Sequence, residues 1–226
     1  GVVAMAKGAQ VSEEHVVLVS GIDSGVRTTA NIGGILPGRG ELADEWVVIG
    51  AHYDHVGFGG IGGMPGNRGR LHPGADDNAS GTAALIELVP LLTDMYEAER
   101  GEAPLRSILF LAFTAEESGL IGSRYYVEHP TLPAGSVNLM INLDMIGRLR
   151  SDTFAVGGFD SADGLLELVR PELEASGLKI VADGNPRGPS DHASFYGAGI
   201  PVLFFFTGTH DVYHQPGDFG WTVNPR

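Results

Sequence analysis

The chain has 226 residues, of which 43% are apolar, 8% aromatic and 19% charged. We expect one domain spanning residues 1–226 that buries roughly 70% of its unfolded surface. The 14 basic and 28 acidic residues give a net charge of −14, and repulsion from phosphates and anionic lipids disfavours nucleic-acid and membrane-surface partners. The chain has no cysteine, which excludes disulfides, thiolate zinc sites and cysteine nucleophiles. No apolar run reaches the length of about 18 residues that membrane insertion needs.

Short apolar runs alternate with helical patterns along the chain. Runs rich in β-branched residues predict buried strands at residues 16–19, 46–50, 108–113, 139–143, 154–156 and 202–206. Apolar residues recur with helical spacing at 82–96 and 162–176, and Pro171 is expected to kink the second helix or divide it in two. Asn78 and Ser80 are predicted to cap the first helix. The pattern predicts an α/β three-layer sandwich, with a central mixed, mostly parallel sheet flanked by helices.

Acids and histidines follow directly after several predicted strands. In a parallel sheet, ligands gather beyond the carboxyl ends of the strands, so these side chains are expected to meet in space. Histidines and carboxylates without a thiolate are the ligand set of zinc or manganese in a hydrolytic site. The candidate site residues are His52, Asp54, Asp76, Asp77, Glu116, Glu117, Asp144, Asp191, His192, Tyr213 and His214.

Six segments in register carry a resemblance to a known family. They are GAHYDH (50–55), GADDNASG (74–81), AEE (115–117), NLDMIG (142–147), SDH (190–192) and YH (213–214). With these segments the sequence resembles the double-zinc aminopeptidases of the M28 metallopeptidase family, over about residues 16 to 218. The resemblance implies a zinc-dependent aminopeptidase, a hydrolase that releases N-terminal residues from peptides with a free N-terminus.

The resemblance also implies the roles of the site residues. His52 and Asp144 would bind one of two Zn²⁺ ions, although other divalent metals remain open, and Glu117 and His214 would bind the other. Asp76 would bridge the two ions, and the peptide bond between Asp76 and Asp77 would be cis. Glu116 would be the general base, and Tyr213 would steady the transition state. The residues expected to support the ligands are Asp54, Asp77, Asp191 and His192.

Elementary chemistry agrees with these roles. Two metal ions about 3.5–4 Å apart can share a bridging hydroxide and lower the pKa of water towards about 7. Asp54 lies two residues beyond His52 in an extended segment and could accept the proton of its second ring nitrogen. Glu116 and Glu117 are adjacent and face different directions, so one can bind metal while the other moves a proton.

Several alternatives stay open at this stage. His210 is a second-choice ligand beside His214, whereas His55 and His72 are interpreted as solvated or hydrogen-bonded histidines. A glutaminyl cyclase on the same fold is one rival function. A carboxypeptidase-type relative is another, and Arg148, Arg150 or Arg187 would hold its substrate carboxylate. A non-catalytic peptidase-like binding domain is disfavoured because every expected ligand is present.

The setting of the domain is inferred from the same resemblance. Relatives commonly carry upstream segments and a further C-terminal helix, so we expect residues 1–226 to be the catalytic domain of a longer chain. The first residues lack the pattern of an intact signal peptide. Secretion, or export to the periplasm or cell envelope, is expected from family habit, and the oligomeric state is open.

Overall fold

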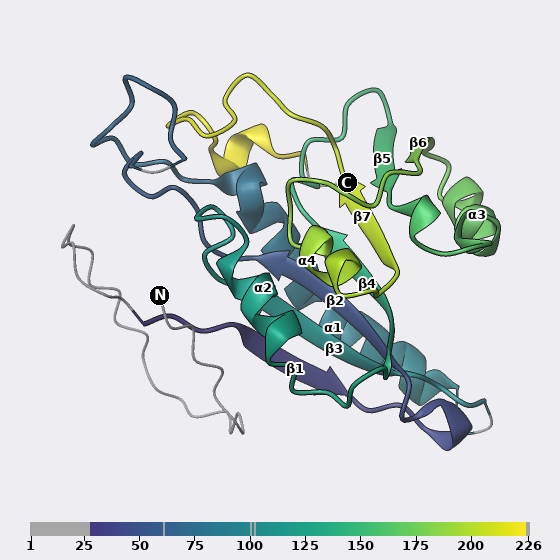
Figure 1. Cartoon of the computed structure of the whole chain (residues 1–226). Helices are drawn as coiled ribbons and strands as arrows, with labels where there is room; N and C mark the ends of the chain where they lie inside the picture. Colours follow the sequence, from purple (N-terminus) through teal and green to yellow (C-terminus); the bar gives the residue numbers. More distant parts are fainter. Residues whose placement is uncertain (1–27, 61, 100, 102, 225–226) are drawn as a thin grey trace.

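A computed structural model describes residues 28–224 except 61, 100 and 102, and it shows one mixed sheet (Figure 1). The order across this sheet of seven strands is β1-β3-β2-β4-β7-β5-β6. The strands are β1 (Ile32–Leu36), β2 (Trp46–His52), β3 (Ser107–Phe113), β4 (Val137–Leu143), β5 (Thr153–Gly157), β6 (Lys179–Asp183) and β7 (Val202–Phe206). The strand predicted at 16–19 lies outside the described residues.

The strand directions place several carboxyl ends at one edge of the sheet. The parallel pairs are β2 with β3, β2 with β4, β4 with β7, and β5 with β6. Antiparallel pairs join β1 to β3 and β5 to β7. His52 pairs in register with Phe113, and Gly50 pairs with Asn142. The segments that follow β2, β3 and β4 therefore emerge at nearly the same level.

Helices cover both faces of the sheet and complete the predicted sandwich. Neighbouring residues of a strand point to opposite faces. Val48 packs in a core with Tyr126 of α2 (Ile121–Glu128) and Phe195 of α4 (His192–Gly197), whereas Ile49 packs in another with Leu85 of α1 (Gly81–Ala98). A third cluster joins β5 and β7 to α3 (Leu165–Ala175). Figure 1 shows α2 and α4 on the near side of the sheet and α1 behind it.

The structure also differs from the predicted elements. Strands β1 and β6 and helix α2 were not predicted, and α3 is one helix that continues through Pro171. Pro171 lies on the exposed side of α3, so the carbonyl group that it leaves unpaired can face solvent. Over the described part of the chain, no helix combines the length and apolarity needed to cross a membrane.

Candidate metal centre

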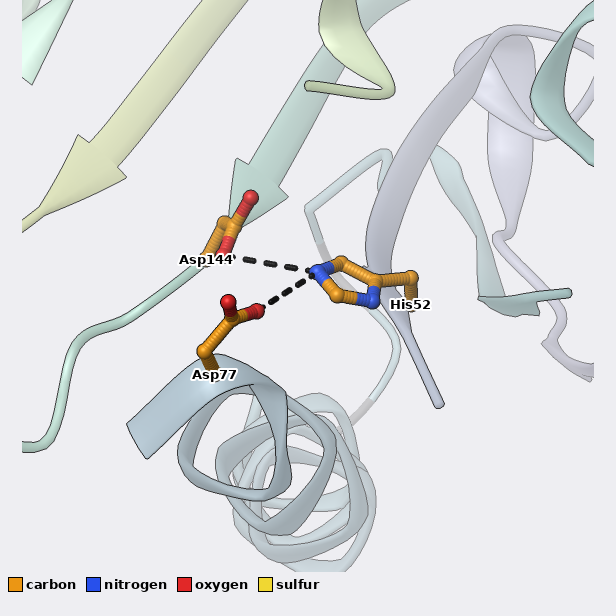
Figure 2. A group of neighbouring side chains, drawn as sticks. All are labelled: His52, Asp77 and Asp144. Atoms are coloured by element: carbon orange, nitrogen blue, oxygen red, sulfur yellow. Dashed lines mark ion pairs between the residues drawn. The ribbon is translucent and has the colours of Figure 1, made fainter. Parts of the chain in front are cut away.

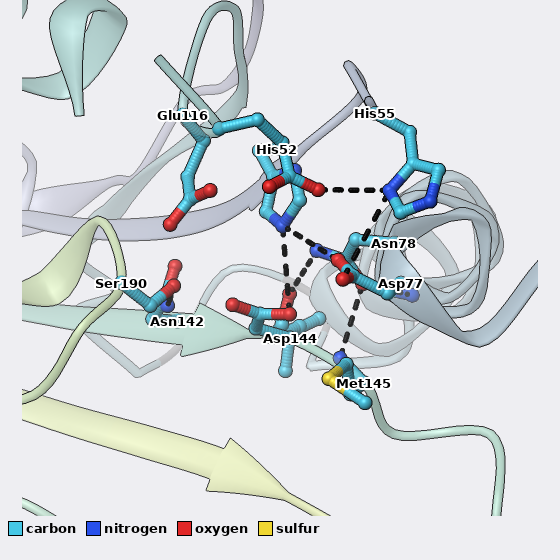
Figure 3. Close-up of polar contacts among 12 residues, drawn as sticks. His52, His55, Asp77, Asn78, Glu116, Asn142, Asp144, Met145 and Ser190 are labelled. Carbon is cyan, nitrogen blue, oxygen red and sulfur yellow. Dashed lines mark hydrogen bonds and ion pairs between the residues drawn. The ribbon is translucent and has the colours of Figure 1, made fainter. Parts of the chain in front are cut away.

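The candidate site lies at the edge where β2, β3 and β4 end. His52 is the last residue of β2, Asp144 directly follows β4, and Glu116 and Glu117 follow β3. Asp77 lies in the irregular turn η2 (Ala75–Ser80), which leads into α1. These side chains point toward one another from separate segments (Figures 2 and 3). The expectation that residues after different strands would meet is thus met by the fold.

His52, Asp77 and Asp144 form a compact trio, here named the His52 group. Nε2 of His52 lies 3.5 Å from Oδ1 of Asp77 and 3.5 Å from Oδ1 of Asp144 (Figure 2). Nδ1 of His52 donates to the main-chain carbonyl of Asp54 at 3.0 Å, which leaves Nε2 free to bind a cation. Ligand atoms around a tetrahedral zinc ion lie about 3.3–3.5 Å apart, because each is about 2.0–2.2 Å from the metal. The two distances from Nε2 of His52 agree with this spacing.

His214 contacts Asp77 and Glu117 and forms with them a second trio, here named the His214 group; His55 also lies within ligand distance of these two carboxylates. Nε2 of His214 lies 3.1 Å from Oδ2 of Asp77 and 3.1 Å from Oε2 of Glu117. Nδ1 of His214 donates to the carbonyl of Gly62 at 2.7 Å, so its Nε2 is the ring nitrogen that faces the carboxylates. Asp77 directs Oδ1 to the His52 group and Oδ2 to the His214 group. One carboxylate therefore links the two groups.

The carboxylate that lies between the two groups is that of Asp77 and not that of Asp76, which differs from the expectation from the sequence. Oδ1 of Asp76 accepts the N–H of Gly147 at 2.7 Å, and its Oδ2 lies 3.2 Å from Nε2 of His210. The cis peptide bond follows Asp77 and joins it to Asn78, one residue later than expected. Adjacent side chains in this non-helical turn face opposite directions. Two neighbouring aspartates with the same chemistry thus have different surroundings. His210 lies beside Asp76 and not beside Asp77, so it is not part of either trio.

Asn78 and Asp54 fix the ligand-bearing segments to one another. Nδ2 of Asn78 donates to the carbonyl of Leu143 at 3.0 Å, and its Oδ1 accepts the N–H of Met145 at 3.2 Å (Figure 3). These bonds tie Asp77 to the strand end that carries Asp144. The same Oδ1 accepts the N–H of Gly81, as predicted for a cap, whereas Ser80 bonds to Asp76 and Ile146.

The carboxylate of Asp54 has a different partner from the one expected. Oδ1 accepts the N–H of Glu116 at 3.0 Å, and Oδ2 accepts the N–H of Glu117 at 3.3 Å. Oδ1 of Asp54 also lies 3.8 Å from Nδ1 of His52, but the hydrogen bond of that ring nitrogen is with the main-chain carbonyl of Asp54 at 3.0 Å. Asp54 therefore orients both the β2 end and the loop of the two glutamates.

The two adjacent glutamates have opposite electrostatic surroundings. Burial, reinforced by Asp191 and Asp144, raises the pKa of Glu116 to about 9. Burial would also raise the pKa of Glu117, but hydrogen bonds from His214 and His55 lower it to about 2. Glu117 is therefore ionised as a metal ligand must be, while Glu116 can hold a proton. Glu116 belongs to neither trio.

The site carries more negative charge than its own groups can neutralise. Burial alone would lower the pKa of His214, yet contacts with Asp77 and Glu117 raise it to about 10. The pKa of His52 is likewise raised, because Asp144 outweighs the effect of burial. Oδ1 of Asp144 is buried without a hydrogen-bond partner. Clustered carboxylates, two imidazole nitrogens directed at them and an unpaired buried oxygen fit divalent cations, which would take the place of the imidazole protons.

A cavity of about 170 Å³ opens over the His52 group. Glu116 and Tyr213 line it, together with Met145, Phe204 and Phe206. The ring of Tyr213 stacks on that of His214, with 3.8 Å between the ring centroids, and burial raises the pKa of its hydroxyl. Tyr213 thus keeps a proton that it can donate within the cavity.

Asp191 and His192 are buried and are not among the residues that line the cavity. Asp191 is fully buried, and burial raises its pKa to about 7. His192 stacks on Phe204 at 4.3 Å between ring centroids, and burial lowers its pKa to about 4. Neither residue belongs to a trio.

Three residues near the trios had no place in the metal site expected from the sequence. His55 contacts Glu117, and Asp218 and Arg148 form an ion pair behind Asp77. His55 stands three residues after His52 and had been interpreted as a non-ligand; Asp218 stands four residues after His214. Their proximity in sequence to the ligands was the available signal, but it does not show what each side chain contacts.

A mixed α/β sheet with two histidine–carboxylate trios at its carboxyl edge defines a site for divalent cations. The Peptidase family M28 profile matches residues 31–226, and the chain belongs to this family. The chain is 32% identical over 207 residues to aminopeptidase YwaD of Bacillus subtilis, covering 85% of this chain and 40% of YwaD. It is 32% identical over 184 residues to leucine aminopeptidase 1 of Leptosphaeria maculans, covering 77% of this chain and 45% of the relative.

Solved structures give the same relationship. BSAP, a zinc aminopeptidase from Bacillus subtilis, superposes with a TM-score of 0.65 at 29% identity, over 86% of this chain and 45% of BSAP. A leucine aminopeptidase precursor from Bacteroides thetaiotaomicron superposes with a TM-score of 0.67 at 20% identity and shows the shared fold. The chain therefore spans less than half the length of YwaD, the fungal relative and BSAP.

Proposed function

We propose that this chain is the catalytic domain of a metal-dependent aminopeptidase that binds two zinc ions. The observation that carries the proposal is the position of Asp77, whose two carboxylate oxygens face the His52 group and the His214 group. Each trio offers one histidine nitrogen and two carboxylate oxygens, which leaves a position open for water or substrate. The names of the relatives, which include zinc aminopeptidases, support the choice of metal and reaction.

The residues of the chain supply proton transfer and orientation. Zinc, when bound, polarises the scissile carbonyl and makes water more acidic. Glu116 lines the cavity outside both trios, and a cation bound beside it would favour its ionised form. Its carboxylate then accepts a proton from the attacking water and returns it to the leaving amine. Tyr213 donates its O–H to the oxygen that becomes negative in the transition state.

The cavity also favours particular substrates. The carboxylates of Asp77, Glu116 and Asp144 line one part of it, which suits a positively charged α-amine. Met145, Phe204 and Phe206 line another part, which suits an apolar N-terminal side chain. We also propose that the protein acts after export, because the relationship to the family suggests an extracellular or cell-envelope enzyme.

The carboxypeptidase alternative receives no support from the arginines that suggested it. Arg148 pairs with Asp218, Arg150 donates to the carbonyls of Thr207 and Thr209, and Arg187 stacks over Tyr196. None of the three is among the described residues that line the cavity. Among the residues that the structure describes, no lysine or arginine lines the cavity to hold a substrate carboxylate.

A peptide library tests the proposed activity. Half of the peptides would carry free N-termini and half acetylated ones, and product masses would be followed with zinc-loaded protein, with and without chelator. Stepwise loss of single residues from free N-termini, abolished by chelator, is expected. Loss of ammonia from N-terminal glutamine would indicate a cyclase, C-terminal trimming would indicate a carboxypeptidase, and no reaction by a protein that holds two ions would contradict the proposal.

A further inference from the structure

His55 makes a close contact with one ligand of the His214 group. Its Nδ1 lies 2.8 Å from Oε1 of Glu117, whereas Oε2 of the same carboxylate lies 3.1 Å from Nε2 of His214. The two oxygens of Glu117 are thus divided between two histidines. The side chain of His55 is 11% exposed, so this hydrogen bond is shielded from water.

The environment of His55 separates it from the two histidines placed as ligands. His52 and His214 each donate Nδ1 to a main-chain carbonyl and turn Nε2 toward carboxylates. Metal-binding histidines nearly always have such an acceptor on the second ring nitrogen. Nε2 of His55 is buried without a hydrogen-bond partner, so its ring lacks the support that a ligand would have.

The distances around His55 lead to the same distinction. Nδ1 of His55 is 3.9 Å from Oδ2 of Asp77, beyond hydrogen-bond reach, while His214 approaches the same oxygen to 3.1 Å. The rings of His55 and His214 meet edge to face, with 5.7 Å between centroids. Nε2 of His214 is therefore nearer than Nδ1 of His55 to the carboxylate of Asp77 that both groups share, and His55 lies beside Glu117.

A glycine makes room for the ring of His55. A Cβ atom added to Gly74 would lie 2.6 Å from Cγ and Cδ2 of His55, closer than real Cβ contacts allow. Gly74 also has a φ of 63°, in the left-handed region that favours glycine. The segment before Asp77 thus permits the position from which His55 reaches Glu117.

We propose that His55 is a positioning residue for the second metal ion, acting through Glu117 rather than binding the ion itself. This inference rests on the proposed two-ion site. Nδ1–H of His55 donates to Oε1 of Glu117 and keeps Oε2 directed at the space shared with His214 and Asp77. Such outer hydrogen bonds fix the orientation of ligands, and their loss typically weakens metal binding about 10–100-fold.

Two substitutions distinguish positioning from direct binding. Nδ2 of asparagine occupies nearly the place of histidine Nδ1 and can donate the same hydrogen bond, but an amide nitrogen is not a zinc ligand. We expect His55→Ala to weaken one of the two zinc ions about 10–100-fold and His55→Asn to stay within about threefold of the parent. The affinities would be measured by competition with a chromophoric chelator, and the zinc count by atomic spectroscopy.

Controls make each result interpretable. His72→Ala removes another buried histidine, whose Nδ1 contacts the carbonyl of Arg70, and is expected to keep both affinities. The absorption spectrum of the cobalt-substituted His55→Asn protein should match that of the parent, because the set of ligands is unchanged. Thermal unfolding would verify that each variant is folded.

The outcomes separate this inference from the proposed function. A parent chain that binds fewer than two ions would contradict the two-ion site itself. If the parent binds two ions, unchanged affinity in His55→Ala would remove any role for His55. Equal weakening in His55→Ala and His55→Asn, with an altered cobalt spectrum, would show that His55 is a ligand and overturn the positioning role.

Discussion

Substitution of Asp218 by asparagine tests whether a buried ion pair holds Asp77 in place. Oδ2 of Asp218 accepts the N–H groups of Asp76 at 3.0 Å and of Asp77 at 3.1 Å. Its Oδ1 lies 2.6 Å from Nη2 of Arg148. The side chain of Asp218 is 1% exposed and that of Arg148 13% exposed, so water cannot readily replace these contacts.

The expected cost follows from what the substitution leaves unpaired. Asparagine carries no charge. Its amide group has one acceptor oxygen, so it cannot accept hydrogen bonds both from the two main-chain N–H groups and from Arg148 as the two carboxylate oxygens do. Breaking a buried ion pair by removing one partner costs about 3–5 kcal/mol. For a chain of this size each kcal/mol shifts Tm by about 2–4 °C, so Asp218→Asn is expected to lower Tm by roughly 6–20 °C.

The assay is thermal unfolding of the zinc-free protein, followed by the zinc count of the folded variant. Asp211→Asn is the matched control, because Asp211 is an exposed acid of the same loop and the same charge is removed. Its Tm should stay within about 2 °C of the parent, as for most surface changes. A similar small shift for Asp218→Asn, with both ions retained, would refute the reasoning.

Three further predictions address the site itself. Glu116→Gln should lower kcat by about 10²–10⁴-fold while leaving two zinc ions per chain, and loss of metal would instead identify Glu116 as a ligand. Asp77→Asn should lose both ions, whereas Asp76→Asn should retain them by atomic spectroscopy; the opposite result would restore Asp76 as the bridge. Burial lowers the pKa of His192 from its ordinary value of 6.5 to about 4. Between pH 6.5 and about 4 the unfolded chain binds a proton at His192 more readily than the folded chain does. The contribution of neutral His192 to the free energy of unfolding is therefore present above pH 6.5 and is lost as pH falls to about 4. The free energy of unfolding, measured with urea on zinc-free protein, should fall by about 3 kcal/mol more in the parent than in His192→Gln as pH is lowered over this range. Parallel pH profiles would contradict the prediction.

The parts of the fold that sequence predicts best are those buried on both sides. Strands β2, β3, β4 and β7 appear as continuous apolar runs because helices cover both of their faces. The edge strands β1 and β6 are largely exposed, and β1 contains two glycines, so neither produces that signal. Helix α2 buries Gly122 and Ser123, small residues that give no apolar periodicity.

The site shows a different limit. The types of ligand can be inferred because acids and histidines follow strand ends, but the choice between Asp76 and Asp77 depends on contacts with residues far along the chain. Gly147 and His210 contact the carboxylate of Asp76, and Asn78 joins the Asp77 side of the turn to the end of β4. No local pattern distinguishes two neighbouring aspartates whose partners lie about 65 to 140 residues away.

The same long-range contacts explain how like charges can be gathered without losing their arrangement. Asp54 joins the end of β2 to the loop after β3, Asn78 joins the turn before α1 to the end of β4, and Asp218 joins that turn to the loop of His214. Each contact connects two ligand-bearing segments through main-chain groups, which do not change their charge when a cation binds. These contacts therefore hold the segments in position against repulsion among the carboxylates. A bound cation can reduce this repulsion without a change in the positions of the segments. We therefore expect substitution of Asp54, Asn78 or Asp218 to weaken metal binding although none of them belongs to a trio.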